Sequence, residues 1–351
     1  MFKFFSSMLG LDVGIDLGSS NIVVYVKDKG IVLNEPSVVA VKKLPRGAGF
    51  EIIAVGREAK AMAGKVPAGI NAICPIEGGV ISNFDVTQEL IKHCLKKVCS
   101  GSAFMTHPRV VVSIPAEITG VERKAVIDAT LGAGAGEAYI VEEPISAALG
   151  VGLPFDKPNG CMVIDIGGGT SEVSVISLGG IVVTSSLRTA GKMMDNAITA
   201  MIRQRYSLLI GDNTAEEVKN TIGSALPMSP ELEMNVKGRD LSDGLPKSDI
   251  ISSIEVREAM EPIFISIEDM VKVALEKMPP ELAKDVVDRG VILTGGVALM
   301  RGFAERISRA INTPVIVAES PLYSVALGVG EILKNLTSMR RILKSVERGA
   351  R

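Results

Sequence analysis

The chain has 351 residues, of which 47% are hydrophobic and 22% charged, and its formal net charge is −2. This length allows two domains of ordinary size, each with its own core. The near-neutral charge disfavours nucleic acid as the main partner. No apolar run is long enough to span a bilayer. Four cysteines without CxxC spacing and two histidines form no metal-ligand pattern, which favours a reducing cytoplasm.

Residues 1–10 form a short amphipathic segment. Plotted at 100° per residue, the apolar side chains fall on one side, and Lys3 and two serines fall on the other. A signal peptide fits poorly because the apolar stretch is short and no small-residue cleavage site follows. We expect an interfacial membrane anchor; the alternative is a segment packed on its own domain. The candidate membrane contacts are Phe2, Phe4, Phe5, Met8 and Leu9.

Two segments of the chain repeat one pattern. VGIDLGSSNIVVYV (Val13–Val26) and VIDIGGGTSEVSVI (Val163–Ile176) each read as an apolar strand ending in Asp, a turn of glycine and small hydroxyl residues, and a second strand. Glycine permits backbone conformations in which N–H groups face phosphate oxygens. One such turn is also a common hairpin signal, but two copies indicate a duplicated fold with one nucleotide between the halves.

The repeated pattern predicts which residues contact the nucleotide. Asp16 and Asp165 would repel a bare phosphate, so we expect them to hold Mg²⁺, mainly through its water ligands. The turn residues expected to face phosphate are Gly18, Ser19 and Ser20 in the first copy and Gly167, Gly168, Gly169 and Thr170 in the second.

Strands and helices alternate along the rest of the chain, which predicts an α/β fold. Residues 31–76 read as a small insertion of short strands and turns, and 227–246 as an irregular or short-stranded stretch. Thr119 is a predicted helix cap. The spacing predicts helices over Val86–Val98, Met193–Tyr206, Ala215–Ile222, Ile254–Met260, Ile263–Lys277 and Val325–Leu336, and buried strands over Arg109–Ile114 and Gly290–Thr294.

Glu142-Glu143-Pro144 lies at a predicted junction between a strand and a helix. A carboxylate at such a place can orient or deprotonate a water for attack on a terminal phosphate. Two consecutive acids in an extended strand do not both point inward, and Glu143, at the helix entrance, is the favoured catalytic candidate. The alternative is that the two acids stabilise the helix N-terminus electrostatically.

Two further motifs lie in the second half of the chain. Glu216 and Lys219 are three residues apart on a predicted helix and share a face, a spacing typical of a solvated ion pair. Gly295-Gly296 follows a strand and can either bring backbone close to a purine or form a tight connection. No G-x-x-x-x-G-K-[ST] occurs, which excludes a P-loop, and no G-x-G-x-x-G follows a strand to support a dinucleotide fold.

Seven segments resemble the MreB/Mbl family of bacterial actins, over nearly the whole chain from about 11 to 336. In chain order they are IDLGSSN, SIPAEITGVERKAV, GAGAGEAYIVEEPISAALGVGLP, VIDIGGGTSEVSVI, TAEEVKNTIGSA, KGRDLSDGLP and ILTGGVALMRG. The resemblance implies the α/β fold of the actin, Hsp70 and sugar-kinase superfamily, a duplicated ATPase with two domains around a nucleotide cleft. It also implies Mg²⁺-dependent ATP hydrolysis coupled to filament assembly on the inner face of the cytoplasmic membrane, where the filament guides the cell-wall elongation machinery and rod shape.

The resemblance also assigns roles to residues of this chain. It matches Asp16, Gly18, Ser19, Ser20 and Asn21 to the first phosphate loop; Asp165, Gly167, Gly168, Gly169 and Thr170 to the second; Glu143 to the hydrolytic residue; Glu216 and Lys219 to nucleoside contacts; and Gly295 and Gly296 to the adenosine turn.

Three segments of this chain can be compared with the usual sequence of the family. DLGSSN stands where the family usually has DLGTAN, and Val297 stands where the family's GGGA has its last glycine. Phe104 and Met105 match a region where relatives insert apolar residues into membrane; the alternative is a loop packed on its own domain.

The resemblance implies a division into two domains with a tail. Domain I is expected over 11–145, with its insertion at 31–76, and domain II over 146–336, with an insertion at 184–258. Residues 337–351 form a basic tail, and we expect Met339–Arg351 to be disordered, with lipid contact as the alternative.

Two other functions in the superfamily share both turns. An Hsp70-like chaperone would need a substrate-binding domain after the ATPase half, for which we expect this chain to be too short. A small-molecule kinase would need a catalytic base for a substrate hydroxyl, whereas the Glu-Glu-Pro junction fits water activation better. The motifs do not separate MreB from its paralogue Mbl.

Overall fold

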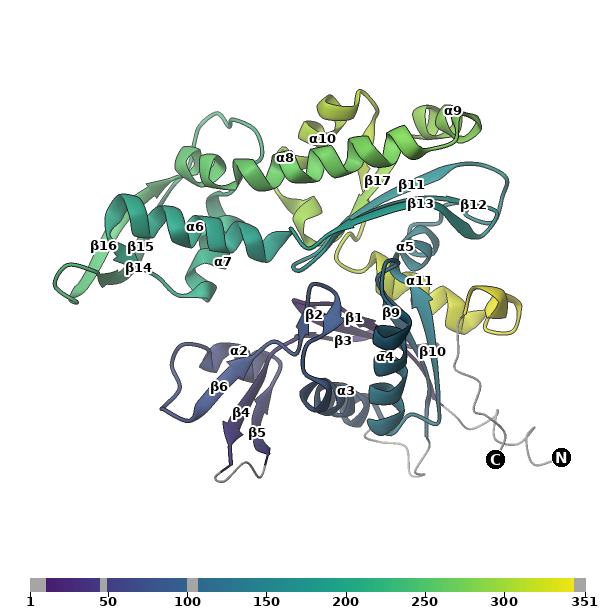
Figure 1. Cartoon of the computed structure of the whole chain (residues 1–351), viewed down its shortest axis with the longest axis horizontal. Helices are drawn as coiled ribbons and strands as arrows, with labels where there is room; N and C mark the ends of the chain where they lie inside the picture. The colour runs from purple at the N-terminus through teal and green to yellow at the C-terminus, as the bar shows by residue number, and fades with distance from the viewer. Residues whose placement is uncertain (1–10, 45–48, 100–106, 344–351) are drawn as a thin grey trace. The chain divides into compact units, whose positions relative to one another are not determined.

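The computed structural model of the chain describes residues 11–44, 49–99 and 107–343 (Figure 1). Their contacts divide the chain into two compact units. Unit 1 comprises the described part of Met1–Asn159, with Ile176–Ile181 and the described part of Tyr323–Arg351, and unit 2 comprises Gly160–Val175 and Val182–Leu322.

The main sheet of unit 1 has five strands in the order β10-β9-β1-β2-β3. β1 pairs in parallel with β9, and β9 with β10, whereas β2 is antiparallel to both β1 and β3. The strands are β1 (Asp12–Leu17), β2 (Asn21–Val26), β3 (Gly30–Pro36), β9 (Arg109–Ile114) and β10 (Glu137–Glu142).

The second main sheet has the order β13-β12-β11-β17-β18, in which β11, β17 and β18 are parallel. Its strands are β11 (Cys161–Ile166), β12 (Ser171–Ser177), β13 (Gly180–Leu187), β17 (Val291–Thr294) and β18 (Val315–Val317). Each sheet contains three strands that are consecutive along the chain, β1 to β3 in one and β11 to β13 in the other. Two later strands, parallel to the first of these three, extend each sheet beside it: β9 and β10 beside β1, and β17 and β18 beside β11. The predicted duplicated α/β architecture is therefore confirmed.

Smaller sheets and the helices complete each unit. Unit 1 adds β4 (Val39–Lys43), β5 (Phe50–Val55), β6 (Ile70–Ile73), β7 (Ile76–Glu77), β8 (Val80–Ile81), α2 (Arg57–Met62), α3 (Phe84–Cys99), α4 (Gly120–Gly132), α5 (Glu143–Gly150), α11 (Ser324–Lys334) and η3 (Ser338–Ile342). Unit 2 adds β14 (Leu208–Leu209), β15 (Glu233–Asp240), β16 (Pro246–Ser252), α6 (Gly191–Tyr206), α7 (Asp212–Ile222), α8 (Ser253–Lys277), α9 (Pro280–Arg289), η2 (Gly296–Leu299) and α10 (Phe303–Ile311).

The main sheet of unit 1 is covered on both faces because successive side chains of a strand point to opposite sides. Val13 and Ile15 of β1 pack in a core with the buried faces of α3 and α4. Gly14, between them, faces α11, where a Cβ atom would lie 2.6 Å from Cγ1 of Val329. The absence of a side chain at this position therefore lets α11 pack directly on β1.

Helices α5 and α11 touch through their backbones. A Cβ atom at Gly150 would lie 1.9 Å from the carbonyl oxygen of Ser324, and one at Gly328 would lie 1.7 Å from that of Ser146. Each helix thus places a serine and a glycine four residues apart on the shared face. Only glycine permits this separation of the two helix axes.

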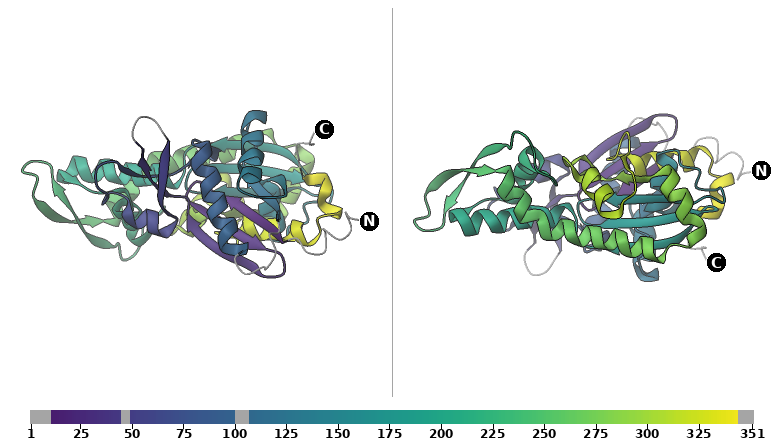
Figure 2. Two further views of the ribbon diagram at one scale, coloured as in Figure 1. Left: turned by 90° about the horizontal axis from the view of Figure 1, so that it is seen from below. Right: turned by 90° about the horizontal axis from the view of Figure 1, so that it is seen from above.

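The core of unit 2 is built around α8, the long green helix in Figure 2. Its buried face includes Phe264, whose ring lies 5.8 Å from that of Phe303 on α10. The guanidinium of Arg306 lies 4.8 Å from the centre of the Phe264 ring, and it is also paired with Glu261 and Glu268. A cation, an aromatic ring and two carboxylates thereby join α8 to α10.

Several predicted elements are confirmed. The helix predicted at Val86–Val98 is α3, and the strand predicted at Arg109–Ile114 is β9 with the same bounds. Thr119 caps α4: its hydroxyl accepts a hydrogen bond from the N–H of Glu122 at 3.2 Å, while Glu122 Oε2 accepts one from the N–H of Thr119 at 2.7 Å. The two helical stretches predicted on either side of Pro262 are one continuous helix, α8.

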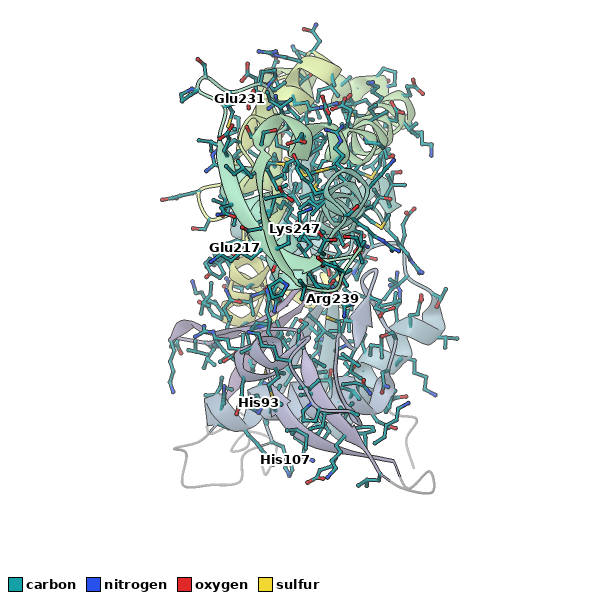
Figure 3. All side chains as sticks on the ribbon, turned by 90° about the vertical axis from the view of Figure 1, so that its left-hand side faces the viewer. His93, His107, Glu217, Glu231, Arg239 and Lys247 are labelled. Carbon is teal, nitrogen blue, oxygen red and sulfur yellow. The ribbon has the colours of Figure 1, made fainter. Side chains whose placement is uncertain are left out.

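The prediction of an irregular or short-stranded stretch over 227–246 is confirmed in its second form, with one strand between irregular segments. Residues Glu233–Asp240 form β15, which pairs along seven positions with β16 and carries Arg239; the facing strand carries Lys247 (Figure 3). Most of β15 is half-buried or exposed, so its sequence is too polar to signal a strand by its apolar residues. Helices α9 and α10 were not predicted.

The predicted domain bounds, 11–145 and 146–336, stay a prediction, because the compact units follow packing and not the repeat. Helices α5 and α11 both belong to unit 1, where they pack on each other and on the main sheet. Among the described residues, no helix combines the length and the apolar character that crossing a bilayer requires.

We predict that Gly328→Ala destabilises the protein, because the new methyl group meets a backbone oxygen and not a flexible side chain. The cost should reach or exceed the upper end of the about 1–3 kcal/mol that overpacking usually causes. Chemical denaturation followed by circular dichroism measures it. Gly120→Ala is the matched control: Gly120 also lies in a helix, but nothing lies within 4 Å of the place that its Cβ atom would take, so this variant should keep or slightly raise the wild-type midpoint. Equal midpoints for the two variants would contradict the account of the α5 and α11 contact.

Candidate functional site

The first predicted carboxylate, Asp16, lies near the carboxyl end of β1. The strand is buried except at this position, where the side chain is half-buried. Asp16 is paired in register with Ser113 of β9, and the Ser113 hydroxyl donates a hydrogen bond of 3.0 Å to Asp16 Oδ1. Burial raises the pKa of the Asp16 carboxyl to about 6, and the bond from Ser113 offsets only part of that rise.

The turn after β1 is fixed mainly through its backbone. Ser37 binds it twice: its hydroxyl donates to the carbonyl of Gly18 at 2.6 Å, and its N–H donates to the carbonyl of Ser20 at 2.8 Å. The Ser19 hydroxyl is buried and accepts a hydrogen bond of 3.1 Å from the N–H of Gly79. Ser37 and Gly79 were not identified from the sequence, although both belong to the predicted insertion or follow it closely.

Asn21, at the start of β2, is connected to the beginning of α11. Its amide donates a hydrogen bond of 2.7 Å to Asn34 on β3, whose own amide donates one of 3.2 Å to the hydroxyl of Tyr323. Tyr323 precedes α11. The exposed residue that follows the first turn is therefore held by Asn34, which in turn binds Tyr323 from a distant part of the chain.

The two consecutive glutamates occupy different positions at the junction of β10 and α5. Glu142 is the last residue of β10, and its Oε1 lies 3.5 Å from Nη2 of Arg123 on α4. Glu143 is the first residue of α5, and Pro144 follows it in the first turn. An arginine partner for Glu142 supports a structural role for that residue.

The second turn repeats the geometry of the first. β11 has the same burial pattern as β1, with Asp165 as its half-buried fifth residue, and Asp165 is paired in register with Thr294. The N–H of Gly167 donates to the carbonyl of Thr170 at 2.9 Å, which closes the turn. Within the described residues, the N–H groups of Gly168 and Gly169 donate to no protein acceptor. These two groups are therefore suited to bind an anion.

Helix α6 begins against the second turn. The N–H groups of Gly191 and Lys192 donate to the carbonyls of Gly167 and Gly168, at 3.2 and 2.8 Å. These bonds turn both carbonyls toward the positive end of α6.

Lys219 of α7 contacts the first turns of α6. Its ammonium donates a hydrogen bond of 3.1 Å to the carbonyl of Gly191 and lies 2.8 Å from Asp195 of α6. Lys219 is therefore joined to the second turn through Gly191, and its ion pair with Asp195 also attaches it to α6. Glu216 lies one turn earlier on α7. The sequence showed the spacing of Glu216 and Lys219 but not the contact with α6.

The predicted adenosine turn packs on the second phosphate turn. Gly295 has φ of +85°, a conformation that favours glycine, and a Cβ atom there would lie 2.4 Å from Asp165 Oδ1 and 2.3 Å from the carbonyl oxygen of Ile166. Its N–H donates to the carbonyl of Pro321 at 2.9 Å. Val297, which replaces the family's last glycine, is buried in the core of unit 2.

The predicted residues therefore form two sets, one in each unit. Unit 1 holds those of the first turn together with Glu143, at the edge where β1 and β10 end. In unit 2, Lys219 is joined to the second turn through Gly191, and Gly295 packs on the end of β11 directly before that turn. The predicted membrane contacts Phe2, Phe4, Phe5, Met8, Leu9, Phe104 and Met105 lie outside the described residues, as does most of the basic tail.

The predicted metal would have few protein ligands. Among the residues that the structure describes, no three His, Cys, Asp or Glu side chains are placed to hold a metal ion together. A single half-buried carboxylate at each strand end fits Mg²⁺, which usually keeps several waters and takes one or two carboxylates along with substrate phosphates. Asp16 and Asp165 are the residues that would hold it.

Comparison with known proteins identifies relatives along nearly the whole chain. The family model described as MreB/Mbl protein matches residues 10–341. The cell shape-determining protein MreB of Escherichia coli (strain K12) is 46% identical over 334 residues, which cover 95% of this chain and 96% of the relative. The cell shape-determining protein Mbl of Bacillus subtilis (strain 168) is 43% identical over 332 residues, which cover 95% of this chain and 98% of the relative.

Solved structures with the same fold cover a similar share of the chain. MreB5 of Spiroplasma citri bound to ADP is 35% identical, with a TM-score of 0.88 over 95% of this chain and 98% of that one. The same protein bound to AMPPNP has a TM-score of 0.87. The MamK double helical filament, 21% identical with a TM-score of 0.77 over 92% of this chain and 98% of that one, shows the fold alone. The predicted actin-like fold is confirmed, and the chain belongs to the MreB/Mbl family.

Proposed function

We propose that this protein is a cytoskeletal ATPase that polymerises into membrane-associated filaments and thereby directs cell-wall synthesis and rod shape. Its family and fold support an actin-like cytoskeletal role. The proposal adds Mg²⁺-dependent hydrolysis of ATP, coupling of hydrolysis to assembly, and a location on the inner face of the cytoplasmic membrane. The partners would be further copies of the chain and the cell-wall elongation machinery.

The observation that carries this proposal is the duplicated strand and turn. β1 and β11 share a burial pattern in which only the Asp near the strand end is partly exposed, and a glycine-containing turn follows each of them. A related protein of this fold, 35% identical, has been solved with ADP and with AMPPNP. We infer that Asp16, Gly18, Ser19, Ser20 and Asn21 bind nucleotide, together with Asp165, Gly167, Gly168, Gly169 and Thr170.

The proposed nucleoside contacts come from the same unit as the second turn. Glu216, Lys219, Gly295 and Gly296 would bind the ribose and base, and the contacts that join Lys219 and Gly295 to the second turn support this assignment. Mg²⁺, held by Asp16 and Asp165 mainly through water, would neutralise charge on the phosphates.

We assign hydrolysis to Glu143. It lies where α5 begins, at the edge of the main sheet at which the parallel strands β1, β9 and β10 end, and this edge is where ligands bind in open α/β sheets. Glu143 would orient the attacking water and accept its proton. Glu142 would stay paired with Arg123 and hold the junction in place.

We predict that Glu143→Ala binds ATP with wild-type affinity but releases phosphate at least about 100-fold more slowly, since a positioned general base typically contributes 10²–10⁴-fold. Phosphate release and equilibrium binding of ATP would be measured on the same preparation. The matched control is Glu142→Ala, which removes the contact with Arg123 and should keep at least half of the turnover. Unchanged turnover in Glu143→Ala would remove its catalytic assignment, and transfer of phosphate to a small hydroxyl compound would favour a kinase.

We predict that the full chain sediments with ATP, and that lipid vesicles with anionic headgroups increase the sedimented fraction. A form without residues 1–9 should still make filaments but lose most of its lipid binding, because the aromatic side chains of that segment would insert at the interface. Co-sedimentation with and without vesicles separates the two claims. If neither form assembles with ATP, the cytoskeletal proposal fails, whereas equal lipid binding by both forms refutes only the anchor.

A further inference from the structure

Arg301 connects the segment after η2 to the end of α7. Its Nη1 atom donates to the carbonyl oxygens of Thr221 and Gly223, at 3.0 and 3.4 Å. Its own carbonyl accepts a hydrogen bond of 2.8 Å from the N–H of Ala225. Thr221 lies in the last turn of α7, and Gly223 follows that helix directly. The guanidinium and the main-chain carbonyl of Arg301 therefore both bind the segment from the end of α7 to Ala225.

This contact completes a closed set of three contacts in unit 2. On one side, Lys219 of α7 reaches the second phosphate turn through Gly191. On another, Gly295 packs directly against Asp165 and Ile166 at the end of β11. Arg301 supplies the third contact: it follows the Gly295 turn closely in the chain, and its guanidinium binds the end of α7. It therefore links α7, which reaches the phosphate turn through Gly191, to the Gly295 turn, which packs on the end of β11, and it fixes the spacing between them.

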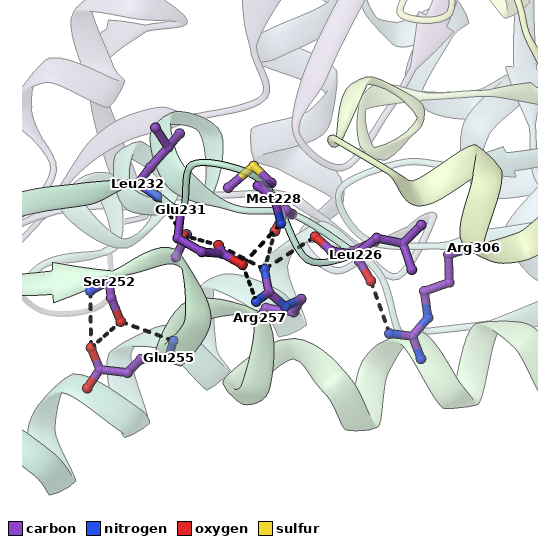
Figure 4. A network of polar contacts seen from close by, with 11 residues as sticks. Leu226, Met228, Glu231, Leu232, Ser252, Glu255, Arg257 and Arg306 are labelled. Atoms are coloured by element: carbon purple, nitrogen blue, oxygen red, sulfur yellow. Dashed lines mark hydrogen bonds and ion pairs between the residues drawn. The ribbon is translucent and has the colours of Figure 1, made fainter.

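The loop after α7 does not depend on Arg301 for its fold. Arg257 of α8 donates to the carbonyl of Leu226 at 3.2 Å and pairs with Glu231 at 2.7 Å, and Arg306 of α10 donates to the carbonyl of Ala225 at 3.3 Å (Figure 4). The main-chain bond from Ala225 to residue 301 needs no side chain. Removing the Arg301 guanidinium should therefore release the end of α7 and leave the loop folded.

An arginine beside the last carbonyls of a helix is also an ordinary C-terminal cap. A cap would change the stability of α7 and nothing else. A residue that fixes the distance between α7 and the Gly295 turn would in addition change how a base is distinguished, because these two elements carry the proposed nucleoside contacts. The two roles can therefore be distinguished, because only a positioning residue changes the ratio of the affinities for two different bases.

We propose that Arg301 is a positioning residue for recognition of the nucleoside. It acts through Thr221 and Gly223 on α7, and it keeps Glu216 and Lys219 at a fixed distance from Gly295. The inference rests on the proposed binding of ATP and deepens it. ATP and GTP share the phosphates and the ribose, so only the contacts with the base can tell them apart. Arg301 would act on this discrimination by setting where the Gly295 turn lies relative to α7.

The test compares the affinities of the full-length wild type, Arg301→Ala and Arg301→Lys for ATP and for GTP, by competition with a fluorescent ATP analogue in the presence of Mg²⁺. In Arg301→Ala, ATP affinity should fall by about fivefold to tenfold, the size expected for one or two hydrogen bonds, while GTP affinity changes by less than about twofold. Arg301→Lys keeps a cation that can donate to Thr221 and should recover most of the preference for ATP. Thermal unfolding of each variant without nucleotide monitors the fold.

The control is Arg205→Ala, which removes an exposed arginine of the same unit that pairs with Glu255 and Glu258 on α8. It should leave both affinities unchanged. If Arg301→Ala lowers the melting temperature but keeps the wild-type ratio of ATP to GTP affinity, Arg301 is only a helix cap and the proposal is wrong. A proportional loss for both nucleotides overturns it as well. A wild-type chain that binds no nucleotide overturns the proposed function, and this inference falls with it.

Discussion

A strand that is buried on both faces can carry a charged group only at its ends. β1 and β11 meet this constraint in the same way: the residues before the acid are buried, and Asp16 and Asp165 are partly exposed near the carboxyl ends of the strands. In both sheets the two neighbouring parallel strands end at the same edge. That edge therefore collects the polar residues of each unit, including Glu143 in unit 1 and Gly295 in unit 2.

The two ends of β1 show how differently a carboxylate can be stabilised. Asp12 is buried and receives two hydrogen bonds of 2.8 Å from the guanidinium of Arg109, with Lys27 at 3.6 Å. Asp16 receives a hydroxyl group from Ser113. An arginine satisfies the charge of Asp12 within the protein, whereas a hydroxyl balances little of the charge of Asp16, which agrees with its proposed role in holding Mg²⁺.

The sequence predicted the elements whose signals are local. Helix α3 has an apolar face at helical spacing, and Thr119 is a residue type that favours a helix N-cap, so both elements could be read without knowledge of their neighbours. Contacts between distant residues could not be read in this way. The pairing of Glu142 with Arg123 joins residues 19 positions apart, and the pairing of Lys219 with Asp195 joins two helices. One signal was available and missed: Ser113 and Thr294 each lie at the end of a predicted strand, where a parallel pairing places a hydroxyl opposite Asp16 or Asp165.

The glycines of the proposed adenosine turn show that a sequence pattern can contain more glycines than the backbone conformation requires. Gly295 has positive φ and contacts the backbone of β11, so both the backbone conformation and the lack of space exclude a side chain there. Gly296 has ordinary space around it, with Leu322 at 3.5 Å from a Cβ atom. Val297 does not have positive φ, and its side chain packs in the core of unit 2. A third glycine would give up the roughly 1.5–3 kcal/mol gained by burying a valine side chain. The turn therefore requires glycine at one position, and valine at the third is compatible with the backbone that the first one sets.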